Sequence, residues 1–306
     1  MRSSSFLLPT LCLLLLFSGC EEYREETDVL NPNGADPVFA DDFGLVINDS
    51  VAYNSASIDF YDFSSQLIYL RKNYSYTYAG EGSFTVLAGE EEIYSGLMYP
   101  VYASWLPSGA FIRSAPGFYN DYIIPIGFLR LIDSDEPSND DPRYDPRIIE
   151  ALKKNNQYRE GLSGEIIGVE KKWGGGMELT LQLRNADQED LLILDPEKTG
   201  ISLFHYFTNG LILSDSTGTT YNHRLKVQEA EPWDSWDKDW LSVIHGGETL
   251  TFKISYSDFD QVPPGSYQAD FTFPGLAFQI KRYELQQNKG RIWLGQVTFT
   301  GNLIVE

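Results

Sequence analysis

The chain has 306 residues with 23 basic and 44 acidic side chains, and its formal net charge at pH 7 is −21. A field of this sign repels nucleic acids and anionic lipid surfaces, so the body of the protein is not expected to bind either. Both cysteines, Cys12 and Cys20, lie near the start of the chain. The rest of the chain therefore offers no thiol catalysis, disulfide or cysteine metal site, and its fold must depend on a hydrophobic core.

The first 19 residues have the organisation of a cleaved signal peptide. Arg2 gives a basic start, an apolar run extends from Leu11 to Phe17, and small residues follow it. The run is shorter than the about 20 apolar residues that a membrane-spanning helix needs. We therefore predict a signal peptide over residues 1–19. An ordinary secretory peptide followed by an incidental cysteine is the alternative.

The ending Ser18-Gly19-Cys20 resembles the lipobox of bacterial lipoproteins. In that family the cysteine becomes the first mature residue and carries acyl chains such as palmitate. The resemblance implies that Cys20 is lipidated, with two or more acyl chains giving the stable attachment that one chain does not. It also implies a place in the bacterial cell envelope, anchored to the outer membrane, with surface exposure left open.

Residues 20–42 are predicted to form a disordered acidic tether, because they are polar, charged and rich in turn residues. Acidic residues follow directly on the cysteine, beginning with Glu21 and Glu22. This pattern resembles the export signal of surface-exposed lipoproteins in some Gram-negative bacteria. A plain solvated linker is the alternative.

The body is predicted to be mostly β, with two antiparallel β-rich domains over residues 43–160 and 161–306. In the N-terminal domain, strands are expected at 66–70, 82–87 and 123–131. One short helix is expected near 146–155. Asp145 can cap this helix and Pro146 suits its first position.

The second domain shows the clearest alternation of apolar and polar residues, in Met177–Arg184, Leu250–Tyr256 and Tyr267–Phe273. Successive side chains of a strand point to opposite faces, so each segment has one core face and one wet face. The triplet Gly174-Gly175-Gly176 separates two such runs and predicts a hairpin.

The strand at Leu179–Asn185, the turn at Gly246–Thr249 and the segment Pro264–Phe271 resemble the bacterial Ig-like sandwich family. They are also similar to the proteinase-inhibitor module built on that plan. The resemblance implies a seven-strand sandwich of two packed sheets at the C-terminus. It assigns no inhibitory loop, because a fold does not determine a function.

Three tryptophans, Trp233, Trp236 and Trp240, fall within eight otherwise polar residues. Large apolar groups on a wet loop often mark a binding site, and tryptophan also anchors protein interfaces. Tryptophan faces pack against sugar C–H groups, while Asp234 and Asp237 can accept hydrogen bonds from hydroxyls. Alternatively, one or two rings pack on the sandwich or the first domain, and their spacing would place all three on one face of a helical turn.

The densest acidic stretch offers a candidate calcium site at Asp133, Asp135, Asn139 and Asp141. Calcium prefers six to eight oxygen ligands, which alternating carboxylates supply. The helix-loop-helix calcium motif is excluded, because Ser138 stands where that family needs glycine. A solvated insertion loop is the alternative, and no other cofactor is expected.

The sequence contains no recognisable catalytic motif. The three histidines, His205, His223 and His245, lie far apart and form no metal-type pair, and Gly-x-Ser-x-Gly and phosphate loops are absent. Glycoside hydrolysis stays open, because it needs only two carboxylates about 5–5.5 or 6.5–9.5 Å apart.

These features favour a lipid-anchored cell-envelope protein that acts as a non-catalytic binding or assembly module. Its partner would be a glycan or another envelope protein, in addition to the membrane reached through Cys20. An envelope carboxylate-based glycan hydrolase and a surface proteinase inhibitor are the alternatives.

Overall fold

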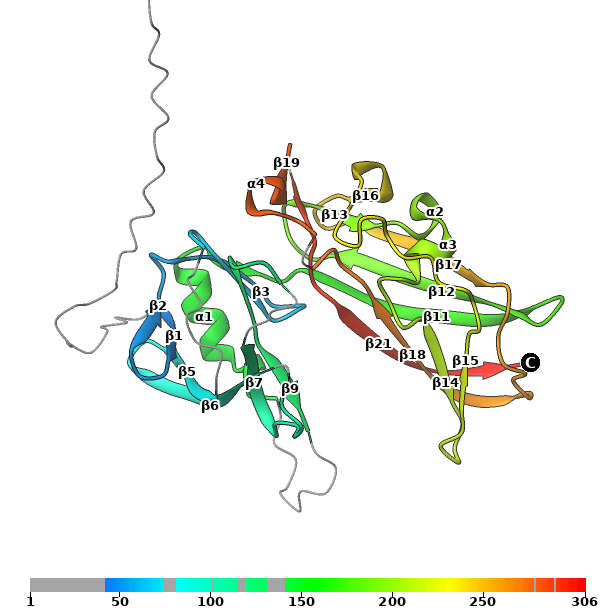
Figure 1. The fold of residues 1–306 in the computed structure, drawn as a ribbon, viewed down its shortest axis with the longest axis horizontal. Helices are drawn as coiled ribbons and strands as arrows, with labels where there is room; N and C mark the ends of the chain where they lie inside the picture. The colour runs from blue at the N-terminus through cyan, green and yellow to red at the C-terminus, as the bar shows by residue number, and fades with distance from the viewer. Residues whose placement is uncertain are drawn as a thin grey trace, which may run out of the picture. The chain divides into compact units, whose positions relative to one another are not determined.

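Figure 1 shows a computed structural model, which describes residues 42–73, 81–100, 102–114, 119–130, 141–277, 279–288 and 290–306. These residues belong to one compact unit of the chain. Strands dominate it, which confirms the prediction of a mostly-β fold. The expected signal peptide, Cys20 and the tether up to residue 41 lie outside the described residues. Among those described, no helix has both the length and the apolar character needed to cross a membrane.

The described residues before Gly161 form two sheets, with strand orders β2-β1-β5-β6-β7-β9 and β10-β3-β4-β8. The bounds are β1 Phe43–Ile47, β2 Val51–Tyr53, β3 Ile58–Asp62, β4 Leu67–Leu70, β5 Gly82–Ala88, β6 Glu91–Pro100, β7 Gly109–Ser114, β8 Ile123–Pro125, β9 Gly127–Leu129 and β10 Tyr158–Arg159. The strands expected at 66–70 and 82–87 are β4 and β5. A single strand was expected at 123–131, but its described part forms two strands in different sheets. β8 pairs with β4, and β9 pairs with β7.

The helix expected near 146–155 is α1 (Pro146–Lys154). Asp145 caps it, with one carboxylate oxygen accepting a hydrogen bond from the backbone N–H of Arg147 at 2.9 Å. Ile148 and Leu152 are fully buried on its inner face. The described residues also hold short helices that the sequence did not predict: α2 (Pro196–Thr199), α3 (Ile201–Phe204), α4 (Arg282–Leu285) and the 3-10 turns η1 (Pro142–Tyr144) and η2 (Lys238–Trp240).

The described residues after Gly161 form three sheets, with strand orders β11-β12-β17, β15-β14-β18-β21 and β16-β13-β20-β19. The bounds are β11 Leu162–Lys172, β12 Gly176–Asn185, β13 Asp190–Leu194, β14 Leu211–Ser214, β15 Thr220–Asn222, β16 Leu241–Ile244, β17 Thr249–Tyr256, β18 Gly265–Phe273, β19 Gln286–Gln287, β20 Gly290–Ile292 and β21 Val297–Val305. The predicted glycine hairpin is confirmed, since β11 and β12 pair up to Lys172 opposite Gly176.

The sheets β11-β12-β17 and β15-β14-β18-β21 face each other across the larger cluster of buried hydrophobic residues, which we call the C-terminal core. The rings of Phe252 in β17 and Phe273 in β18 are 6.5 Å apart, and the Tyr256 hydroxyl accepts a hydrogen bond from Leu211 N–H at 3.0 Å. Most described strand pairs are antiparallel, but β6–β7, β10–β3 and β13–β20 are parallel. The Ig-like topology and the domain boundary near Gly161 stay predictions.

The sheet β10-β3-β4-β8 is buried on both faces. Along β4, Leu67 and Tyr69 belong to the C-terminal core, whereas Ile68 and Leu70 belong to a separate N-terminal core. Alternation of side chains between the two faces of a strand explains this division. It also explains why β4 has no polar position, since a strand buried on both sides becomes continuously apolar.

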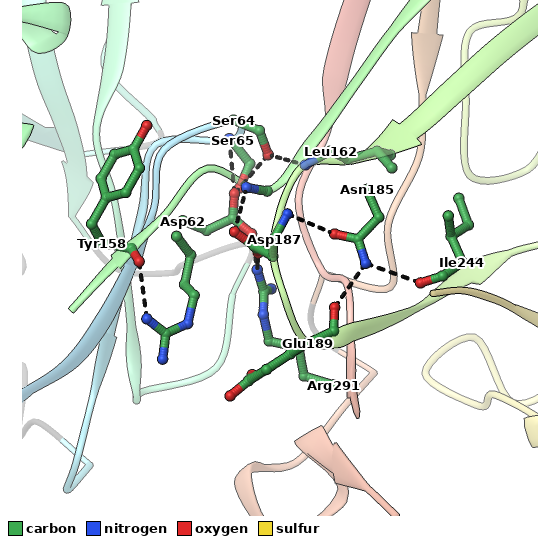
Figure 2. A network of polar contacts seen from close by, with 12 residues as sticks. Asp62, Ser64, Ser65, Tyr158, Leu162, Asn185, Asp187, Glu189, Ile244 and Arg291 are labelled. Carbon is green, nitrogen blue, oxygen red and sulfur yellow. Dashed lines mark hydrogen bonds and ion pairs between the residues drawn. The ribbon is translucent and has the colours of Figure 1, made fainter. Parts of the chain in front are cut away.

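A buried arginine connects the two parts of the unit (Figure 2). Arg291 of β20 places Nη2 2.9 Å from an oxygen of Asp62 at the end of β3 and 2.9 Å from one of Asp187, which follows β12. Asp62 also accepts a hydrogen bond from the Ser64 hydroxyl at 2.6 Å, and Asp187 accepts one from the Gly161 N–H at 3.1 Å. Buried charges are tolerated when they are paired, and these three side chains link β20 to the end of β3 and to the segment that follows β12.

Candidate ligand-binding site

A pocket of about 400 Å³ lies beside the C-terminal core, between the segment that follows α3 and the segment that follows β15. Its lining residues are His205, Tyr206, Phe207, Thr208, Asn209, His223, Val227, Thr272 and Gln296. Aromatic rings and uncharged polar groups dominate this lining. The volume lies in the range of small-molecule sites, about 300–1,000 Å³.

Two of the histidines that are distant in the sequence meet in this pocket. The rings of His205 and His223 stack with their centroids 4.9 Å apart and their planes 27° apart. Tyr256 packs against both, with its ring centroid 4.8 Å from that of His205 and 5.6 Å from that of His223. Gly210, at φ +77°, passes so close that a side chain there would collide with the His223 ring.

The two imidazoles differ in their hydrogen bonds. Nε2 of His223 is 3.1 Å from the carbonyl oxygen of Asn209, which can only accept, so Nε2 is the donor of this hydrogen bond. His205 is 2% exposed, and neither of its ring nitrogens has a hydrogen-bond partner among the described residues. Burial and the neighbouring His223 lower the pKa of His205 to about 4. His205 is therefore neutral at physiological pH, with one ring nitrogen that donates and one that accepts.

The segment that carries the three tryptophans, residues 228–240, lies next to this pocket and is called the tryptophan loop. The Trp240 ring is 6.3 Å from that of Phe207, which lines the pocket, so the loop and the pocket share a wall. Two backbone hydrogen bonds attach the ends of the loop, from Gln228 N–H to Ser202 at 3.0 Å and from Asp195 N–H to Trp240 at 2.9 Å.

The three tryptophans have different environments. Trp236 and Trp240 are half-buried and pack against the C-terminal core, whereas Trp233 is 60% exposed. Within the loop only Lys238–Trp240 forms a helical turn. The three rings therefore do not lie on one face of a helix, which was one of the alternatives. Trp233 is thus the ring of this loop that is best placed to meet a ligand.

Asp234 and Asp237, the two aspartates predicted to accept hydrogen bonds from hydroxyls, are both exposed. Asp237 caps η2, where its carboxylate accepts a hydrogen bond from the Asp239 N–H at 2.9 Å. Asp234 stays next to Trp233 in the chain, which keeps it a candidate for hydrogen bonds to hydroxyl groups.

Most of the predicted calcium site falls on residues that the structure does not describe. Asp133, Asp135 and Asn139 lie outside the described ranges, and Asp141 lies inside them. Asp141 caps η1 and forms an ion pair with Arg143 at 2.6 Å, so its oxygens are already engaged. Within the described residues, no group of three or more His, Cys, Asp or Glu side chains could hold a metal ion. A calcium site on this stretch stays a prediction.

The histidine pair is the part of the site that sequence reasoning missed. His223 follows β15 directly, and the pairing of Ile212 with Asn222 brings it close to Asn209, in the segment that carries His205. The turn at Asp215–Gly218 was visible in the sequence and could have suggested this register. Nothing in the sequence places His205, because it sits in an irregular segment after a four-residue helix.

No protein-family model matches the chain, and no curated protein matches it. The site's own residues define its chemical character. It combines a neutral pocket, an exposed tryptophan ring and hydrogen-bonding groups with no net charge.

Proposed function

We propose that the chain is a lipid-anchored protein of the bacterial cell envelope that binds a neutral glycan, without catalysis, through the tryptophan loop and the adjoining pocket. The signal peptide and the lipobox-like ending at Cys20 support the anchor. The observation that carries the binding role is Trp233, a largely exposed ring on a loop that packs against the pocket wall. An aromatic face next to uncharged hydrogen-bonding groups suits the alternating C–H and hydroxyl surfaces of a sugar.

Charge favours a neutral ligand. The net charge of −21 opposes the approach of anionic polymers, and the described residues that line the pocket include no carboxylate, lysine or arginine. Because glycoside hydrolysis needs two carboxylates beside the bond, this lining favours binding over hydrolysis at the pocket. The hydrolase and the proteinase inhibitor are the less favoured proposals.

The test is a screen of neutral polysaccharides against the full acylated protein in detergent micelles, followed by titration calorimetry of the ligands found. Trp233→Ala is expected to weaken binding at least tenfold, because stacking of one ring is lost. The matched control is Trp173→Ala at the tip of the β11–β12 hairpin, where the ring is 102% exposed and away from the pocket lining. Equal affinities for wild type and Trp233→Ala, or no binding to any polysaccharide, would contradict the proposal.

A protein partner is the second candidate, because exposed tryptophan also anchors protein interfaces. Crosslinking of the acylated protein in its native membranes, read by mass spectrometry, separates the two. One stoichiometric envelope partner whose crosslinks map to residues 228–240 would replace the glycan as the ligand of the loop.

A further inference from the structure

His205 is a buried polar side chain that lines the pocket. Both of its ring nitrogens lack a partner among the described residues, although only 2% of the residue is exposed. Leaving a buried donor or acceptor unpaired costs about 1–3 kcal/mol, and native proteins rarely accept that cost without another partner. His205 is one of the residues that line a pocket of about 400 Å³, so a ligand bound there would lie beside it.

Two other polar groups of the pocket, the Thr208 hydroxyl and the Asn209 carbonyl, already have partners. The Thr208 hydroxyl donates to the carbonyl oxygen of Thr272 at 2.5 Å and accepts from Gly210 N–H at 3.2 Å. The carbonyl oxygen of Asn209 accepts from His223 Nε2. Nδ1 of His223 lacks a partner among the described residues, as the two nitrogens of His205 do. His205 therefore offers one donor and one acceptor that are still open, and Nδ1 of His223 is a third nitrogen without a partner among the described residues.

The form of the site limits the size and chemistry of its ligand. A neutral imidazole donates at one nitrogen and accepts at the other, which matches hydroxyl groups, since each of them can do both. The Phe207 ring supplies an apolar wall, and no charged side chain contributes to the lining among the described residues. A pocket at the small end of the usual range takes one compact ligand rather than a polymer.

We infer that the pocket receives a single neutral sugar unit, the end of a glycan chain or a free monosaccharide, and that His205 binds its hydroxyl groups. This inference rests on the proposed function and adds to it the size of the recognised unit and the residue that selects it. The tryptophan loop would then contact the units that follow outside the pocket.

The test uses the full acylated protein in micelles with glucose, galactose, mannose, N-acetylglucosamine and their methyl glycosides as probes. Binding is measured by calorimetry and by the ¹⁵N chemical shifts of the histidine rings. His205→Phe keeps a planar ring of similar size and removes both nitrogens, so we expect at least a tenfold loss of affinity with an unchanged or higher melting temperature. His205→Gln keeps a donor and an acceptor and is expected to retain part of the affinity.

His245→Phe is the matched control, because that histidine is exposed and pairs with Asp190 away from the pocket lining. It should bind the sugars as the wild type does, and the His205 nitrogen signals of the wild type should shift on binding. If monosaccharides bind but His205→Phe binds them equally well, the inference is wrong and the proposed function stands. The same holds if polysaccharides bind in a Trp233-dependent way while every monosaccharide fails. If no carbohydrate binds at all, the proposed function falls and the inference falls with it.

Discussion

Arg291 and Asp62 form an ion pair of 2.9 Å in which both side chains are almost completely buried. The two residues come from strands more than 200 positions apart in the sequence, and the same guanidinium nitrogen also reaches Asp187. Its planar face lies over the Phe60 ring, with 4.9 Å between the guanidinium carbon and the ring centroid. Because of this arrangement, the loss of a single charge is expected to lower the stability of the contact between the two cores.

Arg291→Met is expected to destabilise the protein by about 3–5 kcal/mol, because it leaves two carboxylates buried without a cation. Urea unfolding followed by circular dichroism measures this change. The triple variant Arg291→Met, Asp62→Asn, Asp187→Asn should recover a large part of the loss, since it removes the unpaired charges. The exposed pair of Arg224 and Asp260 provides the control, because Arg224→Met should cost about 1 kcal/mol or less. A similar small effect for Arg291→Met would contradict the assignment of a buried network.

Gly161→Ala is expected to destabilise the protein by about 2–4 kcal/mol, from a positive φ and a steric clash together. Gly161 has φ +81°, and an added Cβ would lie 2.3 Å from the Ser64 hydroxyl oxygen and 2.5 Å from a carboxylate oxygen of Asp62. Gly174→Ala is the control, because Gly174 has φ +89° but nothing within 4 Å of the added atom. The difference between the two variants in thermal or urea unfolding isolates the clash. If both variants lose the same unfolding free energy, the residues around Gly161 accommodate the added Cβ without a steric cost.

His205 is expected to make stability fall as the solution is acidified from about pH 6.5 towards pH 4. Its pKa is lowered to about 4 in the folded protein by burial, then by the neighbouring His223, against 6.5 for the free side chain. Between those values the unfolded chain binds more protons, so unfolding becomes easier as the pH falls and the effect levels off below the folded pKa.

The stability curves of wild type and His205→Gln between pH 4 and 7 test this, because the many carboxylates contribute equally to both. The gap between the curves should change by about 2–3 kcal/mol over that range. Parallel curves would mean that His205 gains a proton in the folded state as easily as in the unfolded chain.

Asp145→Ala is expected to cost about 1 kcal/mol through the loss of the cap of α1. Asp145 accepts a hydrogen bond from Arg147 N–H, and the Arg147 side chain holds its pKa below the usual value through hydrogen bonds. Asp145→Asn keeps an acceptor and should lose less. Urea unfolding measures both losses. Equal losses for Asp145→Ala and Asp145→Asn would contradict the capping role of Asp145.

Local patterns predicted those elements whose partners are close in the chain. The alternation in Met177–Arg184 and the glycine triplet before it are sufficient for the β11–β12 hairpin, since a turn brings its own two strands together. Asp145 and Pro146 likewise predicted the start of α1 from neighbouring residues alone.

Relationships between distant segments were not predictable in this way. An alternation of apolar and polar residues shows which side chains face the core, but it identifies neither the partner strand nor the direction of pairing. The parallel pairing of β13 with β20 could therefore not be predicted from the sequence. The same limit hid the contact of His205 with His223, whereas the tryptophan loop was visible because its three rings are close together in the chain. The packing of Trp236 and Trp240 against the C-terminal core corresponds to the alternative that the sequence left open for one or two of the rings.

The sheet that contains β4 has a practical consequence for dividing the chain at Gly161. Expressed alone, residues 161–306 would lack Phe60, Leu67, Tyr69 and Ile123, which complete their core, and would present that apolar surface to water. The shorter product should aggregate or bind hydrophobic dyes, and adding back the separate N-terminal part should rescue it only if the shared sheet can reassemble. Aggregation of the shorter product would make the whole body that the two cores share the smallest unit for expression, recombination with other proteins or crystallisation.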